Sequence, residues 1–485
     1  SWSRTQEWRL IFFFFSIYTT TILLVLCVFL AAPLLWAQDK PNIVVIMTDN
    51  LGYGDLGAYG GLRARTPRVD QLAREGVLFQ DFQVEPNCTP SRAAFMTGRM
   101  PIRSGTDGLV MPGQPGGLHP MEVTIAEVLK GAGYATAYYG KWHLGETAER
   151  EPQMQGFDHW YGIHNTSLPV DPNFPGTDME IIESQKVMEG KAGKPAKVVR
   201  DMDIEYRPLI DRDLTEMSVD FIKKEAKSPK PFFLLTSYIN PHHPVVPHPD
   251  FVGKSGGGAY PDVLMEIDYN TGLILDAVDD AGIRENTIVF WFSDNGPTRY
   301  SLQPDQNGDN GMWSGELGSA WEGSLRTAGM MRWPGKIRAD WKTEGMIHVM
   351  DMFTTLGKIG GGDIPTDRPI DGVDQTDWLI GKQDNSARDS RMVFFNGNFV
   401  GIRWRQFKFL TMEYEKKGSL TRPAYTGISA PHLYNLKSDP KEEYNLLGES
   451  GATNVIAHML KMGAKAQMSF QEFPNMDYSK MTRDK

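Results

Sequence analysis

Cysteine is almost absent from this chain, whose 485 residues include two, Cys27 and Cys88. Cys27 lies in an apolar run near the N-terminus that is typical of a signal peptide, a segment removed from the mature protein. Once that run is removed, a disulfide within the mature chain is excluded because Cys88 has no partner. Secreted chains usually keep cysteines in order to pair them, so Cys88 needs another explanation.

The N-terminal segment, residues 1–37, has the layout of an export signal. Arg4 and Arg9 precede an almost uncharged run, residues 11–36, and polar sequence follows it. This order predicts a signal peptide and therefore a periplasmic or extracellular protein. The run is also long enough to span a bilayer, so an uncleaved membrane anchor stays open.

The chain also lacks an excess of positive charge. It has 50 Lys and Arg against 60 Asp and Glu, a formal net charge of −10. This balance argues against nucleic acid or an anionic membrane surface as a partner. It does not exclude an anionic substrate that a few local cations hold.

The length predicts more than one domain. About 450 residues remain after the leader, more than one hydrophobic core usually serves. Residues 382–391 are polar and linker-like, and two strand-like runs in residues 392–414 are broken by Asn396-Gly397-Asn398, a hairpin signal. We predict a large domain over residues 38–384 and a smaller α+β domain with an antiparallel sheet over residues 385–485.

Strand and helix signals alternate through the large domain. Short apolar runs predict strands that are buried on both faces of a sheet, at residues 42–48, 134–139, 231–239 and 287–292. Helices are predicted after Thr66, with Gly76 as the stop, and from Thr124 to Leu129. The pattern predicts an α/β fold with a large, mostly parallel sheet flanked by helices.

Two of these strands end in similar sequences. Asp49 and Asn50 follow the first strand, and Asp294 and Asn295 follow the fourth. Open α/β sheets place ligands at the carboxyl ends of their strands, so the two pairs can meet at one edge. Their hard oxygen ligands suit calcium or magnesium and argue against zinc. A single Asp-Asn pair is more often a turn or a cap.

The segment around Cys88 predicts the start of a helix. Pro90 is tolerated in a first turn, residues 93–96 continue the helix, and Gly98 can close it. The helix dipole favours an anion there, and Arg92 adds a positive charge. Residue types alone therefore indicate a thiolate nucleophile, while an ordinary capped helix with a solvated arginine is the alternative.

The run Cys88-Thr89-Pro90-Ser91-Arg92, followed by Thr97-Gly98-Arg99, resembles the signature of the type I sulfatases. The resemblance covers nearly the whole chain after the leader. Further motifs occur in the family's order at residues 49–54, 140–145, 242–244, 293–296, 321–323 and 433–440. The resemblance implies an alkaline-phosphatase-like fold and hydrolysis of a sulfate monoester, aryl or carbohydrate, to an alcohol or phenol plus sulfate.

In this family a formylglycine-generating enzyme converts the cysteine to formylglycine. The resemblance implies that hydrated formylglycine at position 88 supplies the attacking hydroxyl, and that its second hydroxyl lets the sulfated intermediate collapse by elimination. It also implies a calcium or magnesium ion, with Asp294 accepting the proton of the hydroxyl. The implied metal ligands are Asp49, Asn50, Cys88, Asp294 and Asn295.

The resemblance gives roles to further residues. Lys141 is placed on the sulfate and the leaving-group oxygen, and His143 on the formylglycine hydroxyl. His242 is the expected proton donor to the leaving group, with an imidazole pKa suited to that role. Arg92 is the cation beside residue 88, and Thr166 matches a sulfate-binding hydroxyl. If the segment stays extended, the side chains of Lys141 and His143 face the same way, with Trp142 buried on the opposite face.

The chain departs from the family at two positions. Many members have a second aspartate where this chain has Asn50, and a lysine on the substrate sulfate where it has Leu317. Because one negative and one positive charge are both missing, the net charge of the pocket is unchanged, and we hypothesise a compensated change. Arg299 and Arg326 are the candidates to replace the lysine.

Three other functions stay open. The first is a formylglycine-dependent phosphonate or phosphodiester hydrolase, which the missing sulfate lysine slightly favours. The others are a non-catalytic binding relative and a thiol-based hydrolase. The substrate is not named by the sequence, because specificity is expected from loops, here residues 111–119 and 168–206. His243 and His248 are expected to be structural.

Overall fold

The computed structural model describes residues 40–165, 185–299, 306–412, 414–416 and 431–473. The predicted leader, with Cys27, and Thr166 lie outside these ranges. From Pro41 onward the described residues belong to one compact unit. Within the described ranges, no helix has both the length and the apolar character that crossing a membrane requires.

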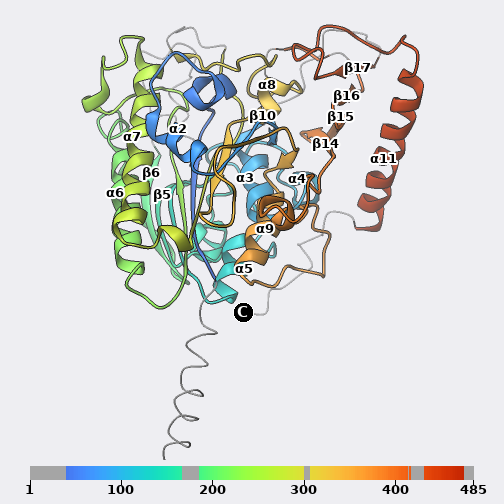
Figure 1. Ribbon diagram of the computed structural model, residues 1–485. Coiled ribbons are helices and arrows are strands. Elements are labelled where there is room, and N and C mark those ends of the chain that lie inside the picture. The colour runs from blue at the N-terminus through green and yellow to red at the C-terminus, as the bar shows by residue number, and fades with distance from the viewer. Residues whose placement is uncertain (1–39, 166–184, 300–305, 413, 417–430, 474–485) are drawn as a thin grey trace, which may run out of the picture. The chain divides into compact units, whose positions relative to one another are not determined.

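A ten-stranded sheet forms the centre of the fold (Figure 1). Its strands are β1 (Asn42–Thr48), β2 (Val77–Phe79), β4 (Ala135–Lys141), β5 (His159–Ile163), β6 (Lys186–Lys191), β7 (Lys197–Asp201), β8 (Phe232–Ser237), β9 (Thr287–Ser293), β11 (Gly329–Arg332) and β12 (Trp341–Thr343). Their order is β12-β2-β11-β9-β1-β8-β4-β5-β6-β7. The central strands β9, β1, β8, β4 and β5 are parallel, whereas β11, β6 and β7 pair antiparallel. The predicted parallel sheet is therefore confirmed for the centre, and its flanks are mixed.

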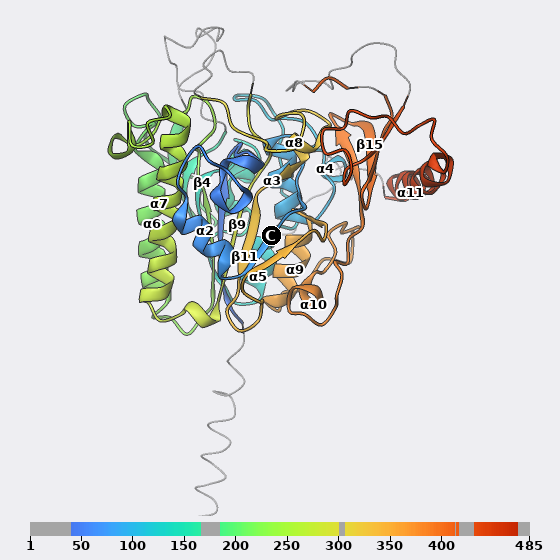
Figure 2. The same ribbon diagram turned by 45° about the horizontal axis from the view of Figure 1, so that its top comes forward.

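Helices cover both faces of the sheet (Figure 2). They are α2 (Pro67–Arg74), α6 (Ile210–Glu225) and α7 (Ala259–Asp280) on one face, and α3 (Cys88–Thr97), α5 (Ile125–Gly131) and α9 (Asp351–Ile359) on the other. Side chains alternate along a strand, so β1 sends Ile43, Val45 and Met47 to one core and Val44 and Ile46 to the other. Strands buried on both faces are apolar throughout, which is why the sequence identified them.

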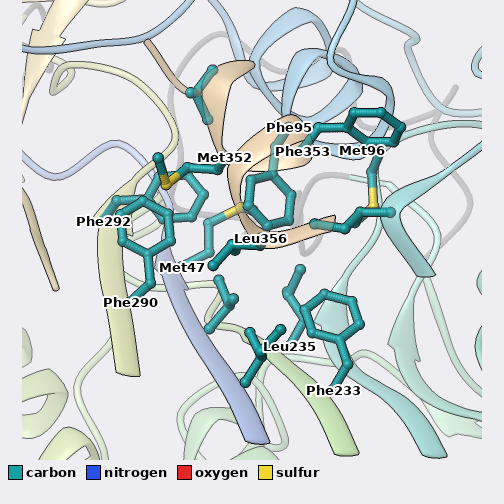
Figure 3. Close-up of a cluster of buried hydrophobic side chains, with 14 of the residues drawn as sticks. Met47, Phe95, Met96, Phe233, Leu235, Phe290, Phe292, Met352, Phe353 and Leu356 are labelled. Carbon is teal, nitrogen blue, oxygen red and sulfur yellow. The ribbon is translucent and has the colours of Figure 1, made fainter. Parts of the chain in front are cut away.

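Aromatic packing fixes α3 against the sheet (Figure 3). The ring centroids of Phe95 on α3 and Phe292 on β9 lie 5.4 Å apart, and those of Phe290 and Phe292 lie 4.8 Å apart. Phe353 of α9 belongs to the same buried cluster. Full burial of one such side chain contributes about 1.5–3 kcal/mol. The cluster thereby holds the N-terminus of α3, where Cys88 lies, beside the sheet.

The predicted elements compare well with those observed. The strands β1, β4, β8 and β9 and the helices α2 and α5 confirm their predictions, and Thr124 caps α5 in a capping box with Glu127. The expectation of a loop across residues 168–206 is wrong for β6 and β7. Every residue of β7 is exposed, so this edge strand carries no apolar run by which the sequence would reveal it.

The C-terminal part contains an antiparallel sheet, as predicted. Its strands are β14 (Ser390–Phe395), β15 (Asn398–Trp404), β16 (Phe407–Leu410) and β17 (His432–Asn435), and α11 (Ala452–Glu472) follows. The predicted hairpin joins β14 to β15, with Asn396 and Gly397 at positive φ. A third strand, β16, lies in the region where two were expected. Buried ion pairs, such as Arg403 with Asp81 at 2.5 Å, tie this sheet to the larger part, and the boundary at residue 385 stays a prediction.

Candidate active site

The carboxyl ends of β1 and β9 bring the two Asp-Asn pairs together. Thr48 lies opposite Ser293 in the parallel register. The backbone N–H of Asn50 donates to Oδ1 of Asp294 at 3.1 Å, and Nδ2 of Asn295 donates to Oδ1 of Asn50 at 2.6 Å. The prediction that these distant pairs meet at one edge of the sheet is confirmed.

Cys88 is the first residue of α3, as predicted, and faces the same edge. Its Sγ lies 3.4 Å from Oδ1 of Asp49 and 3.6 Å from Oδ1 of Asn50. Burial and the carboxylate of Asp49 raise the pKa of the thiol well above its ordinary value. Catalytic cysteines instead have lowered pKa values and partial exposure. The protein groups around Cys88 therefore argue against the thiol-based hydrolase.

Arg92 is buried inside this cluster, so the alternative of a solvated arginine is wrong. Its Nε donates to Oδ2 of Asp294 at 3.0 Å, and its Nη2 forms ion pairs with Oδ2 of Asp294 at 2.8 Å and with Oδ2 of Asp49 at 3.6 Å. Its Nη1 donates to the carbonyl of Lys141 and to Oγ of Ser237, both at 2.8 Å. This guanidinium thereby joins the carboxyl ends of β1, β4, β8 and β9 at one point.

Asp294 is a buried carboxyl with two opposing influences. Burial and the nearby Asp49 raise its pKa to about 6, while Arg92 and Lys141 oppose the increase. Its oxygens accept from Arg92 and from the backbone of Asn50. The structure thus places Asp294 in the cluster, although the contacts of the Cys88 sulfur are with Asp49 and Asn50.

Lys141 and His143 follow β4 into the site. Lys141 is fully buried, and its Nζ lies 2.5 Å from Oδ2 of Asp49. His143 has a φ of 58°, so the segment does not stay extended there. Its Nε2 pairs with the carbonyl of Val110 at 3.0 Å, and its buried Nδ1 has no partner among the described residues. Trp142 is buried in the core, as predicted.

His242 lies on the loop that follows β8. Its Nδ1 and the carbonyl of His243 are 2.6 Å apart. A ring nitrogen of His242, the Cys88 sulfur and a carboxylate oxygen of Asp49 all lie within 4.8 Å of one another. Burial and then Lys141 lower the pKa of His242 to about 3. The loop therefore delivers an imidazole to the pocket that holds Cys88.

The two Asp-Asn pairs form a donor set that fits the predicted calcium or magnesium ion. Asp49, Asn50, Asp294 and Asn295 are at most 2% exposed. The Oδ1 atom of Asn295 is buried without a hydrogen-bond partner in the described protein, and an unsatisfied buried oxygen is costly. Carboxylate and amide oxygens are the ligands of calcium and magnesium rather than zinc, so a hard divalent cation suits this donor set.

Arg326 and Arg299 are the two candidates to replace the missing lysine, and the structure places them in different environments. Arg326 is buried, 2.9 Å from Glu322 and 3.4 Å from Asp81, and its guanidinium lies over the ring of Trp313. Two carboxylates already neutralise Arg326, which argues against it as a sulfate ligand. Arg299 is exposed and stays a prediction. Leu317 is 5% exposed.

Comparison with known proteins decides the family. A family model described as Sulfatase matches residues 41–362, and one described as N-sulphoglucosamine sulphohydrolase, C-terminal, matches residues 318–468. The chain belongs to the sulfatase family. Arylsulfatase A of Homo sapiens is 34% identical over 467 residues, covering 89% of this sulfatase and 88% of the relative. Steryl-sulfatase of Rattus norvegicus is 30% identical over 522 residues, covering 90% of each chain.

Solved structures agree with this assignment. The PsFucS1 sulfatase from Pseudoalteromonas sp. superposes with a TM-score of 0.82 at 30% identity, covering 90% of this sulfatase and 92% of that chain. The resemblance to type I sulfatases and the alkaline-phosphatase-like fold are confirmed. The sulfatase is accordingly a hydrolase that acts on sulfate esters.

Sequence reasoning missed one residue of the cluster. Ser237 ends β8, and its Oγ accepts from Arg92 and donates to the carbonyl of Lys141 at 3.0 Å. The available signal was its position at the carboxyl end of a predicted strand. A lone serine there has many structural roles, and the neighbour that gives it meaning, Arg92, is remote in sequence.

Proposed function

We propose that this sulfatase cleaves an aryl or carbohydrate sulfate monoester with formylglycine, formed from Cys88, and a calcium or magnesium ion. The observation that carries the proposal is the position of Cys88. Its sulfur lies 3.4 Å from Asp49 and 3.6 Å from Asn50, where β1, β9 and α3 meet. A nucleophile at this atom would face both the metal ligands and the cations of the pocket.

The described residues can divide the work of sulfate ester hydrolysis. When present, hydrated formylglycine supplies the attacking hydroxyl and the divalent cation lowers the pKa of that hydroxyl. Lys141 then binds the sulfate and the leaving oxygen, where negative charge develops. Arg92 keeps Asp49 and Asp294 in place, and Asp294 receives the proton of the hydroxyl. The Nδ1 of His143, which has no hydrogen-bond partner among the described residues, is suited to hold the same hydroxyl.

His242 protonates the leaving oxygen in this proposal. The contact between its Nδ1 and the carbonyl of His243 commits Nδ1 to donating, so Nε2 is the nitrogen for the substrate. Burial and Lys141 lower the pKa of His242 to about 3 in the protein alone. A bound sulfate ester is an anion, and a nearby anion favours the protonated imidazole. Substrate binding would therefore raise the pKa of His242 and favour the form that can donate a proton.

We also infer that the protein is exported. Residues 1–37 carry the signal layout, and the mature enzyme would act in the periplasm or outside the cell, cleaved or anchored through residues 11–36. Its partners would be the formylglycine-generating enzyme and a sulfated small molecule or carbohydrate, with no nucleic acid, since the net charge is −10. Terminal sequencing of the protein recovered outside the cytoplasm distinguishes cleavage from anchoring.

The deciding experiment is mass spectrometry of the tryptic peptide that ends at Arg92. The enzyme is produced with and without an active formylglycine-generating system, which gives a matched control of identical sequence. We expect the aldehyde, and hydrolysis of 4-nitrophenyl sulfate, in the first preparation alone. Cys88→Ala should abolish the activity of the first preparation. An unmodified cysteine in an active enzyme overturns the formylglycine proposal, and faster cleavage of a phosphate diester than of the sulfate favours the phosphodiesterase alternative.

A further inference from the structure

Two buried charged residues outside the catalytic cluster contact the loop that carries His242. Arg207 precedes α6 and Asp211 lies in its first turn; they are 0% and 2% exposed. In Figure 1, α6 and α7 cover the face of the sheet opposite α3. The two residues therefore reach the loop from the side away from Cys88.

Asp211 fixes the start of the loop. Its Oδ1 accepts from the backbone N–H of Ile239 at 2.9 Å, and its Oδ2 accepts from that of Asn240 at 3.0 Å. A carboxylate that binds two successive amides sets the direction in which the chain leaves β8. Hydrogen bonds to a charged group are stronger than those between neutral groups, so this direction is strongly held.

Arg207 fixes the rest of the loop through one nitrogen. Its Nη2 donates to Oδ1 of Asn240 at 2.7 Å and approaches the carbonyls of His242 and Pro244 at 3.3 Å each. These acceptors lie before, at and after the proposed acid. The backbone on both sides of the imidazole is thereby tied to a single guanidinium.

The chemistry of Arg207 is poorly explained by fold stability alone. Its Nε and Nη1 are buried without a hydrogen-bond partner among the described residues. Burial lowers its pKa, which the nearby carboxylate of Asp211 partly offsets. A buried cation with unsatisfied donors is a weak source of stability. What the residue does provide is a fixed position for the His242 loop.

We propose that Arg207 and Asp211 are positioning residues that hold His242 toward the leaving-group oxygen. The proposal rests on the role of His242 as proton donor. If the loop loosens, the imidazole shifts and proton transfer suffers, because a misplacement of about 1 Å can lower a rate up to about a hundredfold. The loss should grow with the basicity of the leaving group, since a strongly acidic phenol leaves without a proton.

The test compares two substrates that differ in the leaving group alone, 4-nitrophenyl sulfate and phenyl sulfate, using the formylglycine-containing enzyme. For Arg207→Gln we expect kcat for phenyl sulfate to fall about tenfold or more, kcat for 4-nitrophenyl sulfate to change much less, and both KM values to hold. Arg207→Lys should restore part of the loss, because it keeps one donor for Asn240. Asp211→Asn should show the same selectivity.

Arg332→Gln is the matched control. Arg332 is also fully buried, and its contacts, Glu75 at 2.7 Å and Asp279 at 3.1 Å, lie at the C-terminal cap of α2 and on α7 rather than on the loop. It should reduce thermal stability without changing the ratio of the two kcat values. If Arg207→Gln and Asp211→Asn lower both kcat values equally, as a general loss of folded enzyme would, the positioning role is wrong.

His242→Ala separates this inference from the proposed function. If that variant shows strong leaving-group selectivity while Arg207→Gln and Asp211→Asn show none, the positioning role is overturned and the acid assignment stands. If His242→Ala shows no selectivity, the acid assignment itself is wrong, and so is the inference that rests on it. Thermal denaturation of each variant establishes that the compared proteins are folded.

Discussion

The ammonium of Lys141 lies 2.5 Å from the carboxylate of Asp49, and both side chains are fully buried. Burial alone would raise the pKa of Asp49, but Lys141, His242 and Arg92 outweigh it and hold the pKa below its ordinary value. The carboxylate is therefore ionised beside Cys88, as a cation ligand must be. One contact thus links substrate binding, metal binding and the stability of the pocket.

Lys141→Met should destabilise the metal-free protein by about 3–5 kcal/mol, because removing one partner leaves the other charge buried. Arg92, 3.6 Å from Asp49, compensates in part. Urea denaturation measures the loss. Lys186→Met is the control, since Lys186 pairs with Asp201 at 2.6 Å on the surface and such pairs are worth about 1 kcal/mol at most. Equal effects of the two substitutions would contradict this account.

The sequence predicts the part of the site that depends on strand ends. β1 and β9 are short apolar runs, and each ends in an Asp-Asn pair, so the meeting of Asp49 with Asp294 follows from parallel pairing. The helix start at Cys88 follows from Pro90 and Gly98 in the same way. These features are local, and local features can be identified from neighbouring residues alone.

The contacts that complete the site are not local. The hydrogen bonds from Arg207 to the His242 loop depend on how α6 packs against the sheet. No periodicity of the sequence predicts that packing. The left-handed backbone of His143, with φ of 58°, is imposed by its surroundings, since such a conformation is uncommon for residues other than glycine. β7 is exposed throughout, and its strand pairing is a property of the neighbouring β6.

Glu266 on α7 should make stability depend on pH. Its Oε2 accepts from the backbone of His248 at 2.9 Å, and burial together with Asp211 raises its pKa to about 8 from 4.5. The folded protein therefore keeps a proton that the unfolded chain releases. This contribution to stability is full below pH 4.5 and is lost as the pH rises through about 8.

Glu266→Gln mimics the protonated carboxyl and should flatten this dependence, since each unit of pKa shift corresponds to about 1.4 kcal/mol. Urea denaturation from pH 5 to pH 8.5 measures the slope of unfolding free energy for both proteins. Glu285→Gln, at a side chain that is 78% exposed, should leave the slope unchanged. A slope that Glu266→Gln does not alter would place the pH dependence elsewhere.

Lys408 on β16 joins the C-terminal sheet to the catalytic part. It is fully buried, with its Nζ 3.3 Å from Glu322 and 2.7 Å from Glu442. Lys408→Met should lower the unfolding free energy by about 3–5 kcal/mol, and unfolding should stay one transition because the two parts share these charges. Lys437→Met, at a surface pair with Glu344, is the control. A separate early transition for residues 385–485 would instead support an independent domain.

Asn50 and Leu317, the two positions at which the chain departs from the family, should prove to be energetically coupled. Asn50 lies beside Asp49 and binds Asp294 and Asn295, so Asn50→Asp adds a third carboxylate to a pocket whose buried cations are Arg92 and Lys141. The free energy of unfolding of the metal-free Asn50→Asp protein should therefore fall. Leu317→Lys alone adds a cation with no matching anion and should lower kcat/KM for sulfate esters.

The double variant should recover part of both losses, because its two new charges offset each other. A double-mutant cycle on unfolding free energy and on kcat/KM measures the coupling, which for interacting residues is about 0.5–3 kcal/mol. Additive effects would show that the positions changed independently. A large gain in sulfatase activity from Leu317→Lys alone would contradict compensation more directly, because it would mean that the pocket lacks a cation for the substrate rather than having lost the need for one.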